Sequence, residues 1–329
     1  MPPVVTIIVP NFNHAQYLPE RLESIFSQTY ENYEVLLLDD ASSDDSPKLL
    51  EQYSNHPRVA KLIFNTQNSG STFRQWNLGM ENARGKYVWI AESDDRAHPE
   101  FLSKMVAALE SDEKYTIAFS QSLRINEEGK VIGDWNDWTA DLAPSLFDDD
   151  FSMDGTAFVE HLLLHRNVIP NASAALFRRN TCLSHGLADP AVKYCGDWLV
   201  WLKLALSGYV HYCAQPLNHF RQHSRSVIAT RAGNRKSSFV KKYDIVMREK
   251  FSAHLESTNA PASLKNKAVA LLRKDAEKEA RLAIRLALPE DERHYAAIAS
   301  QGAGGLQRLR LQLRLLAYRI KLHFRPTQS

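Results

Sequence analysis

The chain has 329 residues, with 40 Lys and Arg against 38 Asp and Glu and a formal net charge of +2. Hydrophobic residues make up 44% and charged residues 24%, which is typical of a folded globular protein and excludes an intrinsically disordered one. No apolar run approaches the roughly 18 residues of a membrane-spanning helix, and the N-terminus lacks a signal-peptide pattern. The three cysteines have no close pair, so they suit neither a disulfide framework nor a zinc site. We therefore expect a cytoplasmic protein.

The first hundred residues alternate between strand and helix patterns. Short β-branched apolar runs predict buried strands, and apolar residues at helical spacing predict helices between them. This alternation predicts an α/β fold, with a mostly parallel sheet and helices on both faces. In such sheets, ligands bind beyond the carboxyl ends of the strands. The predicted strands are 4–9, 33–38, 61–65 and 86–91, and the predicted helices are 17–28, 46–53 and 74–83.

The rest of the chain is less regular at first and then helical. Residues 133–156 are irregular and acidic, residues 172–177 resemble a further strand, and residues 197–207 form an amphipathic helix pattern. A basic loop is expected at 221–236. Beyond it the pattern is helical, with breaks near Pro261, Pro289 and 302–305.

Acidic residues gather after the strand at 86–91, where Glu92, Asp94 and Asp95 follow one another closely. Adjacent carboxylates repel each other unless a cation or hydrogen-bond donors satisfy them. A solvated turn that caps the next helix is the plainer interpretation. The position after a buried strand, beside other polar strand ends, favours a divalent metal site.

Two other polar segments lie at predicted strand ends. Asp39 and Asp40 end the second strand, where a carboxylate can accept a hydrogen bond from a nucleotide base or ribose, although part of this loop also suits a helix N-cap. Residues 68–74 contain Gly70 and Arg74 and are compatible with a phosphate loop, or with an ordinary turn.

Later segments offer a candidate base and a cluster of cations. Asp197 opens a predicted helix, where it suits both an N-cap and a general base. Arg221 begins a basic segment that suits a diphosphate, and His223 within it can complete a metal shell. Nucleic-acid binding is the competing interpretation, but the acidic remainder of the chain argues against it because duplex binding needs a broad basic surface.

Taken in order, these segments resemble the inverting family 2 glycosyltransferases of GT-A fold, which use nucleotide-diphospho-sugars. The resemblance covers roughly the first 230 residues, and several motifs in the same order make it specific. The residues at 92–95 look like the family's DxD metal motif, and those at 196–198 look like its catalytic-base motif. The segments that carry it are 4–13, 17–18, 24–30, 38–44, 68–70, 77–79, 83–87, 92–95, 196–198 and 219–227.

The resemblance implies roles for individual residues. Asp197 would be the general base, Asp94, Asp95 and His223 would hold Mn2+ or Mg2+, and Glu92 and Arg221 would face the diphosphate or donor sugar. The sequence departs from the family at Glu92, where Asp is usual, and at Gly196, where an acid commonly precedes the base. The implied nucleotide-binding residues are Pro10, Asn11, Phe12, Asn13, Asp39, Asp40, Arg74 and Asp94.

The implied reaction is one in-line displacement, which inverts the anomeric carbon. The chain lacks the Q-x-x-R-W segment that marks processive synthases, so we expect transfer of one sugar per encounter, with a UDP-sugar as donor, in cell-surface polysaccharide or glycan synthesis. Two alternatives stay open: a catalytically degenerate nucleotide-binding or scaffold protein, and a sugar-phosphate nucleotidyltransferase. The latter would carry a glycine-rich basic N-terminal loop, which residues 10–13 are not.

Aromatic residues in the second half are candidates for acceptor binding. Trp135 and Trp138 lie in the irregular acidic segment, and Trp198 follows the candidate base. Aromatic faces stack on sugar rings, although the same residues also suit the anchoring of a long loop to the core. The acceptor is expected to be a saccharide or a lipid-linked saccharide.

Charge is uneven along the chain. Residues 293–329 contain seven Lys or Arg and no acid, which leaves the remainder at a formal −5. Residues 306–325 show apolar residues on two nearly opposite helical faces with basic residues between them, which suits a helix that touches a membrane surface or a partner, or one packed on its own domain. The stretch 309–315 nearly alternates, so a strand also stays open.

These observations predict two domains. We expect a GT-A catalytic domain at residues 1–235, with a donor half at about 1–98 and an acceptor half at about 99–235. A helical C-terminal extension is expected at 236–329, and through residues 306–325 it would bring the protein to the inner face of the membrane.

Overall fold

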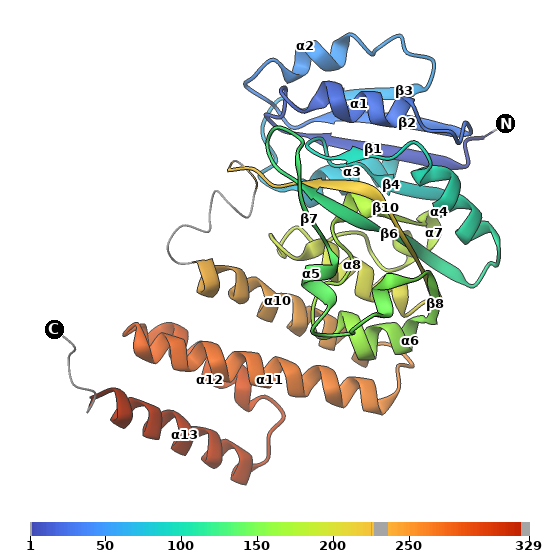
Figure 1. Ribbon diagram of the computed structural model, residues 1–329. Coiled ribbons are helices and arrows are strands. Elements are labelled where there is room, and N and C mark those ends of the chain that lie inside the picture. The colour runs from blue at the N-terminus through green and yellow to red at the C-terminus, as the bar shows by residue number, and fades with distance from the viewer. Residues whose placement is uncertain (1, 225, 227–235, 324–329) are drawn as a thin grey trace. The chain divides into compact units, whose positions relative to one another are not determined.

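The structure is a computed structural model that describes residues 2–224, 226 and 236–323 (Figure 1). Its chain forms two units, Met1–Ser226 and Val227–Ser329. The predicted domain boundary near residue 235 lies outside the described residues. The donor and acceptor halves assigned to the first unit remain predictions.

Within the described residues, ten strands of the first unit form one sheet. Four consecutive neighbours are parallel: β3 (Val59–Phe64), β2 (Tyr33–Asp39), β1 (Val5–Asn11) and β4 (Tyr87–Ile90). Next, β9 (Ala175–Arg178) runs antiparallel to β4 and to β6 (Tyr115–Ile125), and β10 (Tyr209–Arg221) lies parallel to β6. At the far edge, β5 (Arg96–Ala97) and β8 (Phe151–Asp154) pair with β10, and β7 (Val131–Asp134) pairs with β6.

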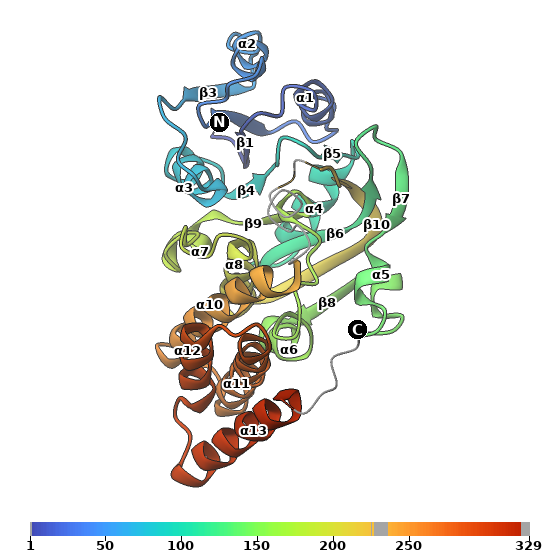
Figure 2. The same cartoon turned by 90° about the vertical axis from the view of Figure 1, so that its left-hand side faces the viewer.

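The predicted α/β class, with helices on both sheet faces, is confirmed. All seven residues of β1 are buried, as expected for a strand covered on both sides. Val5, Ile7 and Val9 join a core with α1 (Leu18–Phe26) and α4 (Phe101–Glu110). On the other face, Ile8 meets α3 (Thr72–Asn82), where a Cβ on Gly79 would lie 2.4 Å from the Ile8 side chain. Figure 2 shows α3, α7 (Arg179–Ser184) and α8 (Gly196–Ala205) on the side away from α1.

The remaining elements of the first unit are short. The predicted helix at 46–53 is α2 (Ser46–Glu51), and the predicted strand at 172–177 begins with a 3-10 turn, η3 (Ala172–Ala174), before β9. The irregular acidic segment contains α5 (Asn136–Thr139) and the 3-10 turn η1 (Leu146–Asp148). After β8 follow α6 (Gly155–Phe158) and a π-helical turn, η2 (Val159–Leu163).

The second unit consists of helices in its described part. They are α10 (Lys236–Glu256), α11 (Ala262–Arg285), α12 (Pro289–Ser300) and α13 (Gly305–His323), and the breaks between them fall where the sequence predicts. The strand alternative at 309–315 is wrong, because Leu311 and Leu315, four residues apart, pack as one face of α13 into a core with α11 and α12. None of the described helices combines the length and the apolar character that a membrane crossing requires.

Candidate functional site

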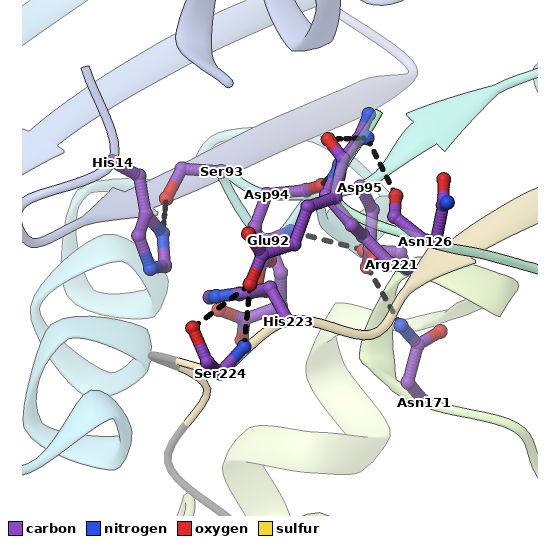
Figure 3. A network of polar contacts seen from close by, with 12 residues as sticks. His14, Glu92, Ser93, Asp94, Asp95, Asn126, Asn171, Arg221, His223 and Ser224 are labelled. Atoms are coloured by element: carbon purple, nitrogen blue, oxygen red, sulfur yellow. Dashed lines mark hydrogen bonds and ion pairs between the residues drawn. The ribbon is translucent and has the colours of Figure 1, made fainter. Parts of the chain in front are cut away.

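Three strand ends bring polar side chains together in the first unit. The residues after β4 carry Glu92, Asp94 and Asp95, the segment after β1 carries His14, and the segment after β10 carries His223 (Figure 3). β1 and β4 are parallel neighbours, so their carboxyl ends lie at the same edge of the sheet. The site is therefore a product of sheet order, as expected for an α/β fold.

His14, Asp94 and His223 form a group that fits a divalent cation. His223 Nε2 lies 2.9 Å from Asp94 Oδ2, and one ligand atom from each of the three residues lies within 4.8 Å of the others. His14 Nδ1 also lies 2.8 Å from Ser93 Oγ, which orients its ring. Two imidazoles and one carboxylate suit Mn2+ better than Mg2+, which prefers an all-oxygen shell.

His14 was missed by sequence reasoning. It directly follows Asn13 in a segment already predicted to bind the nucleotide, so the rule that ligands gather beyond strand ends could have included it. Its neighbour in the structure, Tyr17, packs on the His223 ring at 5.0 Å. Such proximity between residues about 200 positions apart cannot be derived from spacing along the chain.

The three carboxyl groups differ in their environments. Burial and the nearby Asp94 charge raise the pKa of Glu92 to about 8 and that of Asp95 to about 7. Burial also acts to raise the pKa of Asp94, but the hydrogen bond with His223 and the charges of His14 and His223 outweigh it and lower the pKa overall. Of the three carboxyl groups, Asp94 is therefore the one that most readily stays ionised and can bind a cation.

Asp95 and Glu92 are held by protein donors. Asp95 is 1% exposed and accepts hydrogen bonds from Asn171 Nδ2 at 2.6 Å and from the Arg221 backbone N–H at 2.9 Å. Glu92 Oε1 accepts a hydrogen bond from the Trp76 indole at 2.8 Å. These contacts favour a structural role for Asp95 over the predicted metal role, because His14 rather than Asp95 completes the group of candidate ligands.

Arg221, predicted to face the diphosphate or the donor sugar, is engaged by acceptors of the protein itself. Its side chain is 2% exposed, pairs with Glu20, and donates to the backbone carbonyls of Asp94 at 2.7 Å, Asn126 at 3.1 Å and Glu127 at 3.0 Å. A guanidinium buried among four acceptors has little left for a diphosphate. The structure thus favours a positioning role, in which Arg221 holds the Asp94 backbone.

A second buried arginine, Arg21 of α1, was also missed. Its side chain is fully buried, stacks over the Trp89 ring at 4.8 Å and donates to Ser173 Oγ at 3.1 Å. Burial lowers the pKa of Arg21 to about 10, against the raising effect of Asp95, Asp94 and Glu92. Arg21 therefore supplies a positive charge beneath the acidic residues. In sequence it lies three residues after Leu18 and four before Ile25, on the apolar face of the helix, and this spacing is the signal that could have found it.

Removing the Arg21 charge is expected to destabilise the first unit. Arg21→Met keeps much of the volume but leaves the acidic residues without their buried counter-charge, which costs about 3–5 kcal/mol of unfolding free energy. Chemical denaturation without added metal measures this. Arg21→Lys keeps the charge, so its loss of unfolding free energy should be clearly smaller. Equal stability of Arg21→Met and the unaltered protein would show that the acidic residues need no counter-charge.

The predicted nucleotide segment is built by hydrogen bonds between two loops. Asn11 Nδ2 donates to Asp39 Oδ2 at 2.8 Å, and the Ser42 N–H donates to Asp39 Oδ1 at 2.8 Å, so the Asp39 carboxylate is satisfied and buried. Asn13, at a φ of 56°, accepts from the Ser43 N–H at 2.7 Å. Pro10 is buried, whereas Phe12 is 44% exposed and is the ring of this segment that can stack on a base.

Asp40 ties a second loop to the first. Its carboxylate accepts hydrogen bonds from Asn65 at 2.7 Å, from the backbone and hydroxyl of Ser69 at 2.9 and 2.7 Å, and from Gln75 at 2.8 Å. Arg74, in the first turn of α3, is exposed. Asp39 and Asp40 thus shape the loops, and their direct contact with a nucleotide stays a prediction.

Asp197 lies in the first turn of α8, whose N-cap is Cys195. Asn167 Nδ2 donates to Asp197 Oδ2 at 3.0 Å, and the backbone carbonyl of Asn167 accepts from the Trp138 indole at 2.9 Å. The structure gives a reason for a glycine at position 196, where the family commonly has an acid. A Cβ at this position would lie 2.6 Å from the Phe73 ring.

The aromatic candidates divide into exposed and buried ones. Trp138 is 48% exposed and stacks with Arg166, and Trp135 packs against Trp138 and Phe220. Trp198 is 6% exposed and donates to the Leu163 carbonyl at 2.7 Å, so it anchors α8 in the core. This burial favours a structural role for Trp198, and its predicted role in acceptor binding stays a prediction.

Several known proteins are similar to this chain. A family model described as "Glycosyl transferase family 2" matches residues 6–179. An uncharacterized glycosyltransferase from Haemophilus influenzae is 29% identical over 225 residues, which cover 67% of this chain and 66% of that protein. Two further relatives are matched over 21% and 20% of their own lengths, so the chain spans less than two thirds of these relatives.

Two solved structures are similar in fold. S. aureus TarS 1-349 in complex with UDP-GlcNAc has a TM-score of 0.69 and 16% identity, over 96% of this chain and 88% of that chain. The mannosyltransferase PcManGT from Pyrobaculum calidifontis, in complex with GDP-Man and Mn2+, has a TM-score of 0.59 and 20% identity, over 98% of this chain and 84% of that chain.

Proposed function

Because this chain belongs to glycosyl transferase family 2, we propose that it transfers one sugar from a nucleotide-diphospho-sugar to a hydroxyl of a saccharide or lipid-linked acceptor. The proposed donor is a UDP-sugar. The reaction would invert the anomeric carbon, depend on a divalent cation and release the product after each transfer. Such a reaction serves the synthesis of cell-surface polysaccharides or glycans. A cytoplasmic site of action, with contact to the membrane surface through 306–325, completes the proposal.

The convergence of His14, Asp94 and His223 at the sheet edge carries this proposal. Helix α3 connects that group with the candidate base. From α3, Trp76 donates to Glu92, and Phe73 packs against Gly196, the residue before Asp197. Residues next to the candidate cation ligands and next to the candidate base thus contact the same helix, which supports a transferase with a metal-bound donor and a general base.

The chain's own residues account for most of the proposed mechanism. Phe12 would stack on the base, while the loops held by Asp39 and Asp40 shape its surroundings. Asp197 would take the proton of the acceptor hydroxyl as that oxygen attacks the anomeric carbon and the bond to the diphosphate breaks. Asn167 orients the Asp197 carboxylate, and a single displacement inverts the configuration.

His14, Asp94 and His223 would hold the cation, for which Mn2+ suits their donor atoms. When bound, the cation supplies positive charge that stabilises the departing nucleoside diphosphate. The solved structures of similar fold support the donor class, since one contains UDP-GlcNAc and the other GDP-Man with Mn2+.

The proposal is tested by incubating the full chain with a panel of UDP-, GDP- and dTDP-sugars, with Mn2+ or with EDTA. We expect one donor to raise the melting temperature and to be hydrolysed slowly without acceptor, and EDTA to abolish the hydrolysis. Binding of nucleoside diphosphate without any turnover would favour a degenerate binding protein. No response to any donor would contradict the proposal.

A further inference from the structure

Helix α13 of the second unit carries an apolar stripe that the described residues of this unit leave exposed. We define the stripe as five residues with 51–64% of their surface exposed: Leu306, Leu309, Leu313, Leu316 and Ile320. Their spacing of three and four residues places them along one side of the helix. Leu311 and Leu315, on the opposite side, are 5% and 6% exposed and pack into the helical core. The helix thus buries one apolar side and exposes another.

Basic residues border the stripe. Helix α13 contains Arg308, Arg310, Arg314, Arg319 and Lys321 and no acidic residue. On a helical projection, Arg310, Arg314 and Lys321 fall on one flank of the stripe, and Arg308 and Arg319 fall on the other. Arg314 pairs with Glu277 of α11, and Arg319 pairs with Glu292 of α12. These ion pairs hold the two arginine side chains beside the stripe.

A basic cavity adjoins the stripe. It has a volume of about 780 Å³ between α11 and α13, and Lys274, Arg273, Arg310 and Arg314 line it together with the single carboxylate of Glu277. Leu313 belongs both to the stripe and to the cavity wall. A cavity rich in cationic donors next to exposed aliphatic side chains matches a molecule with an anionic head and apolar chains.

We propose that the apolar stripe and basic cavity of the second unit dock on a bilayer of anionic phospholipids, with the leucines among the acyl chains and the cavity against lipid phosphates. Charge complementarity selects this occupant. A second copy of the chain would bring two basic helices together, and their like charges would repel. The helix would lie in the plane of the interface, since no described helix can cross a membrane. The inference rests on the membrane contact in the proposed function and names its surface and lipid class, while its test uses no sugar transfer and can fail independently of the proposed reaction.

The test is flotation of the full-length protein with vesicles of phosphatidylcholine alone, or of phosphatidylcholine with phosphatidylglycerol. We expect binding to the anionic vesicles that weakens at high salt. Leu309→Gln with Leu316→Gln should weaken binding by at least about tenfold. The matched control, Leu286→Gln with Leu288→Gln, alters exposed aliphatic residues outside the stripe and should bind as the unaltered protein.

The charge contribution is tested separately. Lys274→Gln with Arg310→Gln removes two cations of the cavity and should weaken binding by about tenfold or more, since each basic residue near an anionic surface contributes about 1 kcal/mol. Lys278→Gln with Arg285→Gln removes the same charge from exposed positions of α11 outside the cavity and should have a smaller effect. Far-ultraviolet circular dichroism checks that each variant keeps its helices.

Three outcomes would overturn the proposal. They are no binding to either vesicle, equal binding to both vesicles, or unchanged binding by the Leu309→Gln/Leu316→Gln variant. A dimer in sedimentation equilibrium that this variant dissociates, with no vesicle binding, would assign the stripe to a second copy instead.

Discussion

Asp197→Asn is expected to lower the turnover number of sugar transfer by about a hundredfold to ten-thousandfold, the range of a lost general base, while the affinity for the donor nucleotide changes little. The amide has almost the shape of the carboxylate, and its oxygen can still accept the hydrogen bond from Asn167. It cannot take the proton of the acceptor hydroxyl at neutral pH. Single-turnover kinetics and calorimetric titration with nucleoside diphosphate measure the two quantities.

Two comparisons sharpen this prediction. Asp149→Asn makes the same chemical change at an exposed position outside the site and should transfer sugar normally. Asn167→Ala removes the donor to Asp197 but keeps the backbone carbonyl that Trp138 uses. Because the carboxylate is then no longer held by Asn167, turnover should fall while the affinity for the donor nucleotide is kept. Normal turnover by Asp197→Asn would remove Asp197 from the role of base.

The second large effect is expected from the metal group. Asp94→Asn removes its single carboxylate and should reduce Mn2+-dependent transfer by at least about a hundredfold. His14→Gln and His223→Gln should each weaken Mn2+ binding by about ten- to a hundredfold, with activity partly recovered at high Mn2+. Electron paramagnetic resonance of Mn2+ in the presence of nucleoside diphosphate measures binding directly, without reference to turnover.

His161→Gln is the matched control, since His161 is exposed and lies outside the group. The decisive residue is His14, which sequence reasoning did not identify. If His14→Gln binds Mn2+ as tightly as the unaltered protein, His14 is not a ligand, and Asp95 returns as the candidate. If all three variants bind normally, the cation is not held at this group.

The sequence pattern was sufficient for the fold class and for the general place of the site. Apolar β-branched runs such as 4–9 bury both faces of a strand whichever neighbours they acquire, so their periodicity is a local property. The polar residues that follow such strands lie at one sheet edge because parallel strands end there together. Asp94 could be selected on this basis. His223 was selected from its basic segment, the roles of Phe12 and Asp197 came from the resemblance to the family, and all four roles remain proposals.

Which of two similar residues takes which role depended on tertiary structure. Asp94 and Asp95 are adjacent in sequence, yet Asp95 is engaged by Asn171 and the Arg221 backbone, while Asp94 lies against two histidines. Trp138 is exposed and Trp198 is buried, although both are tryptophans near polar residues. Which partner satisfies a side chain depends on segments far away in the chain, and periodicity contains no information about them.

Charge shows the same division at the scale of the whole molecule. The sequence by itself determined that an almost neutral chain consists of an acidic body and a basic C-terminal end, because composition along the chain is independent of folding. Only the tertiary structure decided which leucines of α13 pack inward and which stay exposed, and that four cations surround one cavity. The physical reason is that burial and neighbouring charge are properties of packed surfaces, which form when distant helices meet.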